Sequence, residues 1–394
     1  MPSAKSRNLA CGVRATPPDT VNFSAADHRF MAQALRLARR GLTTTTPNPR
    51  VSCVLVQGGV VVGEGYTQPA GQNHAEIEAL ADAHSRNAAT RGATAYITLE
   101  PCSHYGLTPP CAEALIGAGV SRVVAAMQDP NPRVSGQGIE RLRAAGITTA
   151  CGLMAAEAGE LNLGFVSRMT RGRPWLRLKV AASLDGKSAL KNGRSQWITS
   201  APARLDGHRW RARACAILTG IGTVRDDDPR LSVRGIATGR QPLKVVVDSR
   251  LELPLSAQVL EGGKLLVAAA SADAAKIAAL ASRGAEVVVL PNRHGKVDLA
   301  ELMSELARRG INEIHAEAGV KLNGSLLREG LVDELLLYLA PTLLGDAARG
   351  MFDLPELSDL AGRRDLSVSD VRRVGGDIRI LARLLSHKGP GPLP

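Results

Sequence analysis

The sequence predicts an α/β protein of two domains, and three observations support this prediction. At 394 residues the chain is longer than one ordinary hydrophobic core accommodates. Short β-branched and aliphatic runs alternate with segments whose apolar residues recur at helical spacing. The segment Arg171-Gly172-Arg173-Pro174 interrupts this alternation near the middle of the chain. We therefore expect domains at 24–170 and 173–388, with disordered extensions at 1–23 and 389–394.

The first domain is expected to begin with a helix followed by a hairpin. Ser24 and Asp27 match a capping box at the start of the helix. Apolar residues then recur at helical spacing until Gly41, and they are Met31, Leu35 and Ala38. Residues 51–57 and 60–66 are two β-branched runs separated by two glycines, a pattern that predicts a β-hairpin.

The remaining elements alternate between strand and helix. Short strands are expected at 93–99 and 122–127, each next to a helical stretch, and a helix at 155–163 closes the first domain. The expected strands of the second domain are 175–180, 216–218, 243–248, 264–269, 286–290, 314–317 and 334–339. Helical stretches such as 274–283 and 299–308 separate them. This alternation predicts a mainly parallel sheet covered on both faces.

Composition narrows the classes of function. The formal net charge of +12 suits a nucleic-acid partner, small phosphorylated substrates or simply a basic surface. Aromatic residues make up 3% of the chain, which disfavours a protein that stacks single-stranded bases. No apolar run approaches the roughly 20 residues of a membrane helix, and the first two dozen residues contain no apolar signal-peptide core. We therefore expect a cytoplasmic enzyme without a membrane partner.

Four residues in two segments have the character of a catalytic zinc site. His74 and Glu76 lie in one segment, and Cys102 and Cys111 flank an eight-residue interval in the other. Zinc binds imidazole and thiolate, and a catalytic site keeps a fourth position for water, whose pKa the ion lowers to roughly 7. We predict Zn²⁺ ligands at His74, Cys102 and Cys111, and proton transfer by Glu76. The motifs fall at predicted helix starts, where positive potential favours thiolates.

Two alternatives for these residues stay open. Cys102 and Cys111 could form a disulfide, although a cytosolic chain keeps its thiols reduced. A structural zinc site would need a fourth protein ligand, which His104 could supply. The other cysteines are expected to be buried thiols without a shared motif, and they are Cys11, Cys53, Cys151 and Cys215.

Two small-residue turns in the second half follow predicted strands. Residues 314–325 run from an apolar strand through Gly319 into a helix, and 219–224 form a similar turn. Helix starts of this kind bind phosphates through backbone N–H groups, but neither turn has the three spaced glycines of a Rossmann fingerprint. Most of the nearby arginines are expected to be solvated surface charges, and the set is Arg211, Arg213, Arg225, Arg230 and Arg234.

From about Asp27 to Leu385 the chain closely resembles the RibD family of bifunctional riboflavin-biosynthesis enzymes. In the first half the resemblance rests on Pro47-Asn48-Pro49-Arg50-Val51, Gly63-Glu64-Gly65-Tyr66, His74-Ala75-Glu76, the interval between Cys102 and Cys111, and Asp129-Pro130-Asn131-Pro132. In the second half it rests on residues 181–186, 195–200, 222–224, 227–229, 247–249 and 317–319. The long interval between the cysteines is specific to this family, since nucleic-acid deaminases usually have a much shorter one.

The resemblance implies a fold and a set of contacts. The fold is an N-terminal cytidine-deaminase-like zinc domain followed by a dihydrofolate-reductase-like domain. The implied NADPH contacts are Ala181, Trp197, Thr223, Asp227, Ser249, Gly319, Val320, Lys321, Leu322, Asn323, Gly324 and Ser325. The implied substrate contacts are Asn48, Ser195, Arg211, Leu231, Arg234 and Glu317. We therefore expect Arg211 and Arg234 to bind the substrate rather than to be solvated surface charges, because a ribose phosphate needs charged donors.

The resemblance also implies two reactions. The first is zinc-dependent hydrolytic deamination of 2,5-diamino-6-(5-phosphoribosylamino)pyrimidin-4-one. The second is NADPH-dependent reduction of the ribosyl group of 5-amino-6-(5-phosphoribosylamino)uracil to ribityl. A closed glycosylamine has no hydride acceptor, so the sugar must open with the help of an acid, and Lys179 and Asp185 are the candidates. The expected partners are phosphorylated pyrimidines and a second copy of the chain, not nucleic acid.

Three residues depart from the family pattern, namely Ser52, Thr67 and Asn73, and Thr67 bears on how the deaminase pocket holds its substrate.

Two alternative functions remain open. A nucleic-acid-editing deaminase would share His74, Glu76 and the Pro-Cys element. The second alternative is a zinc-stabilised module without activity. The presence of Glu76 disfavours it, because a structural zinc site gains nothing from that carboxylate.

Overall fold

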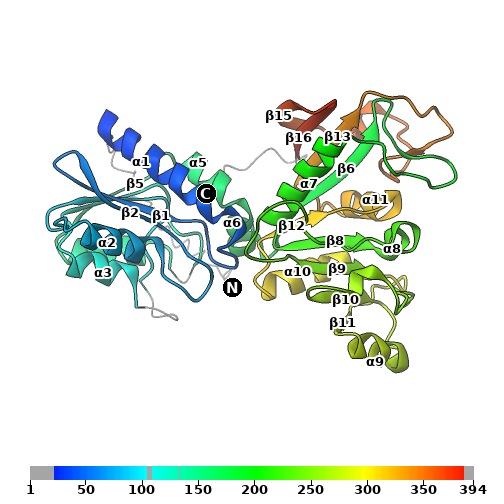
Figure 1. Ribbon diagram of the computed structural model, residues 1–394, viewed down its shortest axis with the longest axis horizontal. Coiled ribbons are helices and arrows are strands. Elements are labelled where there is room, and N and C mark those ends of the chain that lie inside the picture. Colours follow the sequence, from blue (N-terminus) through cyan, green and yellow to red (C-terminus); the bar gives the residue numbers. More distant parts are fainter. Residues whose placement is uncertain (1–21, 104–108, 133, 386–394) are drawn as a thin grey trace, which may run out of the picture.

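The fold consists of two α/β domains that lie side by side (Figure 1). The structure is a computed structural model that describes residues 22–103, 109–132 and 134–385. The predicted α/β class is confirmed. Apart from residues 22 and 23, the predicted extensions at 1–23 and 389–394 lie outside the described residues, as do Cys11 and His104.

Within the described residues, a five-stranded sheet forms the centre of the first domain. Its strands are β1 (Ser52–Gln57), β2 (Val60–Tyr66), β3 (Thr94–Ile97), β4 (Arg122–Ala125) and β5 (Thr148–Cys151). Their order is β2-β1-β3-β4-β5, with β1 antiparallel to β2 and β3, and with β3, β4 and β5 parallel. The predicted hairpin is therefore confirmed as β1 and β2, whereas β5 was not predicted.

The helices of the first domain pack around this sheet. They are α1 (Ala25–Ala38), α2 (Ala75–Ser85), α3 (Cys111–Gly117), α4 (Gln137–Ala144), α5 (Ala155–Leu161) and α6 (Leu163–Arg171), with a 3-10 helix η1 (Arg39–Thr43) after α1. The predicted capping box is present, because Ser24 Oγ accepts from the Asp27 N–H at 3.1 Å and Asp27 Oδ2 accepts from the Ser24 N–H at 2.9 Å. Tyr96 and Arg122 also donate to Asp27, which ties α1 to the sheet.

One predicted helix of the first domain is wrong in its extent. Residues 155–163 were expected to form a single helix, but α5 ends before Asn162 and a second helix, α6, continues to Arg171. The physical reason is the tertiary role of Asn162, whose side chain accepts from the Arg50 N–H at 2.8 Å and donates to the Arg50 carbonyl at 3.1 Å. That contact lies 112 residues away along the chain, so no local pattern announces the break.

A nine-stranded sheet runs through the described part of the second domain. Its strands are β6 (Trp175–Ser183), β8 (Ala216–Gly220), β9 (Leu243–Val247), β10 (Leu265–Ala269), β11 (Ala285–Val289), β12 (Glu313–Ala316), β13 (Glu334–Ala340), β15 (Leu366–Val374) and β16 (Asp377–Leu384). The order is β11-β10-β9-β8-β12-β6-β13-β16-β15. All neighbours from β11 to β13 are parallel, whereas β16 is antiparallel to β13 and β15. The prediction of a mainly parallel sheet is confirmed.

Both faces of the central strands of this sheet are buried, as predicted. Along β10, Leu266 and Ala268 belong to one hydrophobic cluster, whereas Leu265, Val267 and Ala269 belong to another. This alternation follows from the period of two along a strand. The covering helices are α7 (Ala201–Arg213), α8 (Ile221–Asp227), α9 (Ala274–Ser282), α10 (Leu299–Arg308) and α11 (Val320–Arg328), with 3-10 helices η2 (Gln258–Leu260) and η3 (Leu360–Gly362).

Several elements of the second domain were not predicted. A small pair of strands, β7 (Lys187–Ala189) and β14 (Arg349–Gly350), lies outside the main sheet. Strand β15 is an edge strand without a buried residue, and α7 does not gather its apolar residues on one side. Neither element has the one-sided pattern on which sequence prediction depends. None of the helices in the described ranges is long and apolar enough to cross a membrane.

Candidate functional site

The three predicted metal ligands come together in the first domain. His74 is the N-cap residue of α2, and Cys111 is the first residue of α3. His74 Nδ1 lies 3.4 Å from Cys111 Sγ and 3.7 Å from Cys102 Sγ. All three ligand atoms lie within 4.8 Å of one another, and no other such group of His, Cys, Asp and Glu occurs in residues 22–103, 109–132 and 134–385.

The electrostatics of these ligands favour a cation. Hydrogen bonding to Cys111 lowers the pKa of the Cys102 thiol to about 4 against the effect of burial, and His74 adds to this lowering. The same hydrogen bond, together with burial, raises the pKa of Cys111. The backbone N–H of Cys111 donates to Cys102 Sγ at 3.3 Å, which further stabilises a thiolate there. The pair of sulfurs therefore carries negative charge beside an imidazole.

Zinc fits this donor set. One imidazole and two thiols are the soft ligands that zinc prefers, and three protein ligands leave a position for water. Cys102 and Cys111 are free thiols, so the disulfide alternative is not formed. The structural-zinc alternative depends on His104 and is not tested, because His104 lies outside the described residues.

Glu76 lies beside the ligands without being one of the three. It stands in the first turn of α2, two residues after His74, and its side chain is buried. Burial, reinforced by the negative charge of Cys102, raises the pKa of Glu76 to about 7. A carboxyl group that holds and releases a proton near neutral pH is suited to proton transfer.

A buried carboxylate that was not predicted supports the cysteine segment. Glu100, two residues before Cys102, accepts hydrogen bonds from four backbone N–H groups, those of Asp129, Gly136, Gly138 and Ile139. A Cβ at Gly138 would lie 2.0 Å from the Pro101 carbonyl oxygen, so α4 approaches this segment closely. Glu100 thereby fixes the turn that carries Cys102. In the sequence, the position of Glu100 two residues before Cys102, in Leu99-Glu100-Pro101-Cys102, was the signal that could have identified it.

The three departures from the family pattern are accommodated within the first domain. Ser52 is fully buried, and its hydroxyl donates to the Ala34 carbonyl at 2.5 Å. Thr67 is buried, and its N–H donates to the Val51 carbonyl at 3.0 Å. Asn73 donates through its side chain to Glu78 at 2.9 Å. None of these contacts removes a ligand from the metal cluster.

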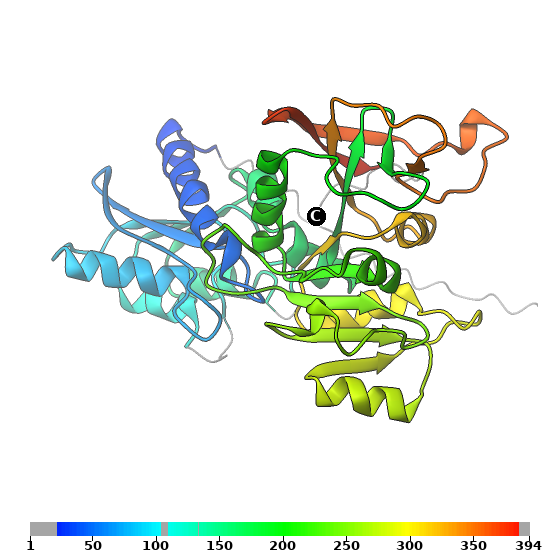
Figure 2. The ribbon, with the colours of Figure 1, turned by 45° about the vertical axis from the view of Figure 1, so that its right-hand side comes forward.

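In the second domain, predicted cofactor residues gather at one edge of the sheet. Thr223, Ser249 and Gly319 follow the carboxyl ends of β8, β9 and β12, where open α/β sheets bind ligands. Figures 1 and 2 show α8 and α11 side by side at this end. A Cβ built on Gly319 would lie 3.7 Å from Thr223 Oγ1, which confirms that the two turns adjoin. Ala181 lies near the carboxyl end of the neighbouring strand β6.

The helix that follows Gly319 divides the predicted turn into two parts. Gly319 is the N-cap of α11 and supplies no side-chain cap, so the N–H groups of Val320, Lys321 and Leu322 suit an anionic ligand. The other three predicted residues lie further along the helix. Asn323 donates to the Met351 carbonyl at 3.2 Å, and a Cβ on Gly324 would meet the Asp353 carbonyl. Ser325 donates to the Lys321 carbonyl.

The segment before α7 supplies further predicted residues. Ser195 and Gln196 donate to Asp227 at 3.5 and 3.3 Å, so the predicted substrate and cofactor residues Ser195 and Asp227 are neighbours. Trp197 is 68% exposed, and the Arg204 guanidinium lies 4.5 Å from the centre of its ring. Such an exposed indole is available to a planar ligand.

Two predicted substrate residues form a charged pair near the end of β12. Arg211 Nε and Nη2 donate to the two oxygens of Glu317 at 2.5 and 3.0 Å, and Lys179 Nζ lies 3.6 Å from Glu317 Oε2. Burial alone would raise the pKa of Glu317, but Arg211 and Lys179 hold it well below its ordinary value. Glu317 is therefore ionised between two cations.

Two histidines that were not predicted belong to the same region. His208 lies one turn before Arg211 on α7 and accepts from the Arg234 N–H at 3.2 Å. Burial, with the charges of Arg211 and Arg234, lowers the pKa of His208 to about 4. His315 is fully buried, with Nε2 3.1 Å from Glu317 Oε1. The available signals were their spacings, three residues before Arg211 and two before Glu317.

The surface-charge interpretation of the nearby arginines holds for some of them and fails for one. The surface-charge interpretation is wrong for Arg213, which donates to the buried Glu313 at 2.9 Å. Arg225 and Arg230 do lie in exposed contacts, with Glu252 and Gln258. The Leu231 side chain is 2% exposed within a hydrophobic cluster.

Asp185 is poorly suited to the role of acid. Its carboxylate accepts from Ser183 Oγ and from the N–H groups of Leu344 and Gly345. The hydrogen bond from Ser183 and these N–H groups lower its pKa. Asp185 therefore anchors the 344–345 turn as an anion, and of the two candidate acids only Lys179 contacts Glu317 among the described residues.

Comparison with known proteins matches both domains. Residues 24–127 match the family model described as the cytidine and deoxycytidylate deaminase zinc-binding region. Residues 174–380 match the RibD C-terminal domain. The riboflavin biosynthesis protein RibD of Escherichia coli is 47% identical over 365 residues, covering 89% of this chain and 98% of that protein. The RibD of Haemophilus influenzae is 44% identical, covering 91% of this chain and 98% of its own length.

Solved structures agree with this result. The structure of Acinetobacter baumannii RibD superposes with a TM-score of 0.85 at 42% identity, covering 92% of this chain and 99% of that one. A Thermotoga maritima structure, described as a diaminohydroxyphosphoribosylaminopyrimidine deaminase and 5-amino-6-(5-phosphoribosylamino)uracil reductase, superposes with a TM-score of 0.81 at 31% identity. It covers 91% of this chain and 99% of its own length.

Proposed function

The chain belongs to the RibD family, and we propose how its residues divide two steps of riboflavin biosynthesis between the sites described above. It is a bifunctional enzyme, a zinc-dependent deaminase followed by an NADPH-dependent reductase. The proposed domain limits are 24–170 and 173–388. The observation that carries the assignment is the convergence of His74, Cys102 and Cys111 beside the buried carboxyl group of Glu76.

The first step is the deamination of 2,5-diamino-6-(5-phosphoribosylamino)pyrimidin-4-one. Zinc, when bound by His74, Cys102 and Cys111, supplies a water of lowered pKa. Glu76 takes a proton from this water as its oxygen bonds to C2, and then gives the proton to the departing amine. The C2–N bond breaks and ammonia leaves. Asn48 orients the pyrimidine ring for this attack.

The second step reduces the ribosyl group of 5-amino-6-(5-phosphoribosylamino)uracil. NADPH supplies the hydride. Lys179 protonates the ring oxygen as the C1–O bond opens to a protonated imine, and hydride addition at C1 neutralises this cation and leaves a ribityl chain. Arg234 and Ser195 bind the phosphorylated sugar, with Arg211 held in place by Glu317. Leu231 is the remaining proposed substrate contact, and the whole residue is buried.

The proposed cofactor contacts follow the edge of the second sheet. The free N–H groups at the start of α11 suit the phosphates of NADPH, and Thr223 adjoins them. Trp197, Asp227, Ser249 and Ala181 complete the proposed lining. Asn323, Gly324 and Ser325 would support the turn. The first two adjoin residues 351–353, and Ser325 donates to the Lys321 carbonyl of the same helix.

The proposed partners are phosphorylated pyrimidines and a second copy of the chain. Strand β15 supports self-association, because it is an edge strand whose Val368 and Val371 are 57% and 60% exposed. Sedimentation of the whole protein would measure its oligomeric state, and a monomer at micromolar concentration would contradict self-association.

Free thiols at Cys53, Cys151 and Cys215 support a cytoplasmic location. We propose no nucleic-acid partner.

The experiment that tests the function offers the diaminopyrimidine phosphate with NADPH or with NADH and records ammonia and cofactor oxidation separately. We expect ammonia in both cases, and cofactor oxidation that follows it rather than precedes it. Omitting the nicotinamide should leave ammonia release intact. Cofactor oxidation without ammonia release, or deamination of single-stranded RNA or DNA in place of the pyrimidine phosphate, would contradict the assignment.

A further inference from the structure

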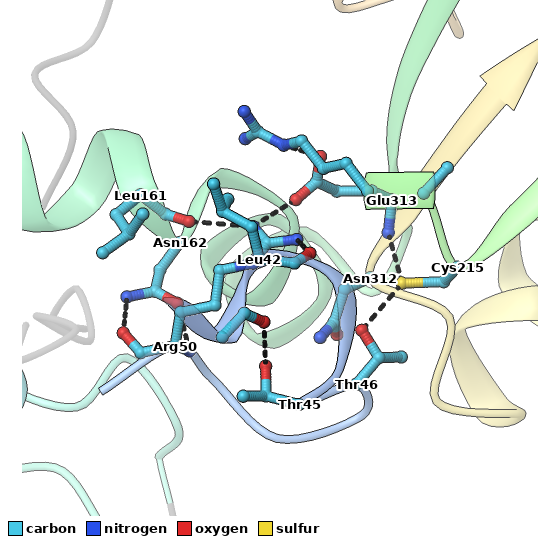
Figure 3. Close-up of polar contacts among 12 residues, drawn as sticks. Leu42, Thr45, Thr46, Arg50, Leu161, Asn162, Cys215, Asn312 and Glu313 are labelled. Atoms are coloured by element: carbon cyan, nitrogen blue, oxygen red, sulfur yellow. Dashed lines mark hydrogen bonds and ion pairs between the residues drawn. The ribbon is translucent and has the colours of Figure 1, made fainter. Parts of the chain in front are cut away.

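The segment Thr46–Arg50 of the first domain is held by residues of the second domain (Figure 3). This segment contains Asn48, and its own backbone supplies one turn, in which the Asn48 N–H donates to the Thr45 carbonyl at 2.9 Å. Some of its other polar contacts stay within the first domain, and three cross to residues at the start of β12 and just before β8. The two domains meet here, where α6 also contacts β12.

Asn312 fixes the peptide unit that leads into Asn48. Its side-chain nitrogen donates to the Pro47 carbonyl at 3.1 Å. Its side-chain oxygen accepts from Arg168 Nε at 2.6 Å, and Arg168 Nη2 donates to the same Pro47 carbonyl at 3.2 Å. Because a peptide unit is planar, holding the Pro47 carbonyl also sets the direction in which the chain enters Asn48.

Arg50 anchors the other end of the segment. Its guanidinium donates to Glu313 Oε1 at 2.5 Å, and the two side chains are 6% and 0% exposed. The same guanidinium donates to the carbonyls of Leu161 and Leu42, so its donors are shared between the domains. Burial by itself would raise the pKa of Glu313, but Arg213, Arg50 and Arg177 together hold it below its ordinary value. A buried charge pair with such partners specifies one geometry.

The surrounding packing has little room for a different arrangement. A Cβ on Gly164 of α6 would lie 2.5 Å from the Asn312 carbonyl oxygen. A Cβ on Gly310 would lie 3.0 Å from Pro47 Cβ. Thr46 Oγ1 lies 3.2 Å from Cys215 Sγ, the residue just before β8. At Gly164 backbone therefore meets backbone across the interface, and small side chains pack closely beside it.

We propose that Asn312 and Glu313 of the reductase domain are positioning residues for the deaminase reaction, because they fix the segment that presents Asn48 to the pyrimidine. This inference rests on the proposed function, in which Asn48 orients the substrate ring. Its consequence is that deamination in the first domain depends on two residues of the second domain, which performs the other reaction. In sequence they lie 263 and 265 positions from Arg50 and Pro47, the residues that they hold. Reduction, whose residues lie at the opposite end of β12, does not share this dependence.

The test replaces Asn312 in the whole protein by Ala and by Asp. Asp has the shape of Asn and still accepts from Arg168, but it offers no donor to Pro47. We expect both variants to raise the KM for the diaminopyrimidine phosphate at least fivefold with a smaller change in kcat. The zinc content and the rate of NADPH oxidation on the aminouracil should stay within twofold of wild type. A Glu313→Gln variant, which keeps an acceptor for Arg50, should show the same split to a lesser degree.

The matched control is Glu160→Gln. Glu160 also joins the domains, through Arg383 at 2.8 Å, but this pair is partly exposed and does not touch Thr46–Arg50. We expect both activities of this variant to equal wild type. An unchanged deaminase KM in both Asn312 variants, or an equal loss of both activities with a lower melting temperature, would overturn the positioning role. A wild-type protein that releases no ammonia would refute the proposed function itself, and this inference with it.

Discussion

The Glu76→Gln variant is expected to release ammonia about a hundredfold to ten-thousandfold more slowly than wild type. Gln has nearly the same shape but neither takes a proton from water nor returns it to the leaving amine. Glu76 is not one of the three clustered ligands, so the variant should bind one equivalent of zinc. Its NADPH oxidation, measured with the aminouracil as substrate, should be unchanged. The measurements are initial rates of both reactions and metal analysis on the same preparation.

Glu78→Gln is the matched control for this variant. Glu78 lies in the same turn of α2, but it contacts Asn73 at the surface rather than the ligand cluster. It should deaminate at close to the wild-type rate. Unchanged ammonia release in Glu76→Gln would remove Glu76 from the proposed role. Loss of zinc from that variant would give it a structural role instead.

The Lys179→Met variant is expected to oxidise NADPH about a hundredfold to ten-thousandfold more slowly on the aminouracil, while it deaminates normally. The reason is that opening of the sugar requires an acid, and we propose that this acid is Lys179, whose Nζ lies 3.6 Å from Glu317 Oε2. Lys179→Arg separates charge from proton transfer, because a guanidinium keeps the ion pair but does not give up its proton. We expect Lys179→Arg to fold normally and to remain slow.

The control for the second site is Lys187→Met, since Lys187 is also a lysine of this domain but contacts the Asp346 carbonyl instead of Glu317. Its reduction rate should equal that of wild type. If Lys179→Met reduces the aminouracil at the wild-type rate, Lys179 is not the acid. A Lys179→Arg variant with full activity would assign it only an electrostatic role.

The sequence contained the metal site almost completely, because its chemistry is carried by residue types at short spacing. His74 and Glu76 are two residues apart, and both helix starts follow from local signals. The parallel core of the second domain was equally predictable, since buried strands such as β10 are continuous apolar runs. The edge strand β15 was not, because a strand without a buried face has no one-sided pattern.

The contacts between the domains were beyond sequence reasoning for a different reason. Arg50 and Glu313 are 263 positions apart, and nothing in either segment identifies its partner. Arg213 was taken for a surface charge, although it donates to the buried Glu313. His208 was overlooked because its one signal, the spacing of three residues to Arg211, gains weight only once Arg211 is placed at the site. The roles of such residues can be identified only after the fold brings distant segments together.

X-ray absorption at the zinc edge of the purified protein distinguishes an open zinc site from a closed one. We expect one zinc ion per chain with two sulfur ligands at about 2.3 Å, one imidazole, and one light atom from water. The water signal should respond to an added pyrimidine inhibitor. A second imidazole or a third sulfur in the coordination shell would contradict the account, because a closed site leaves no place for the water that attacks the substrate.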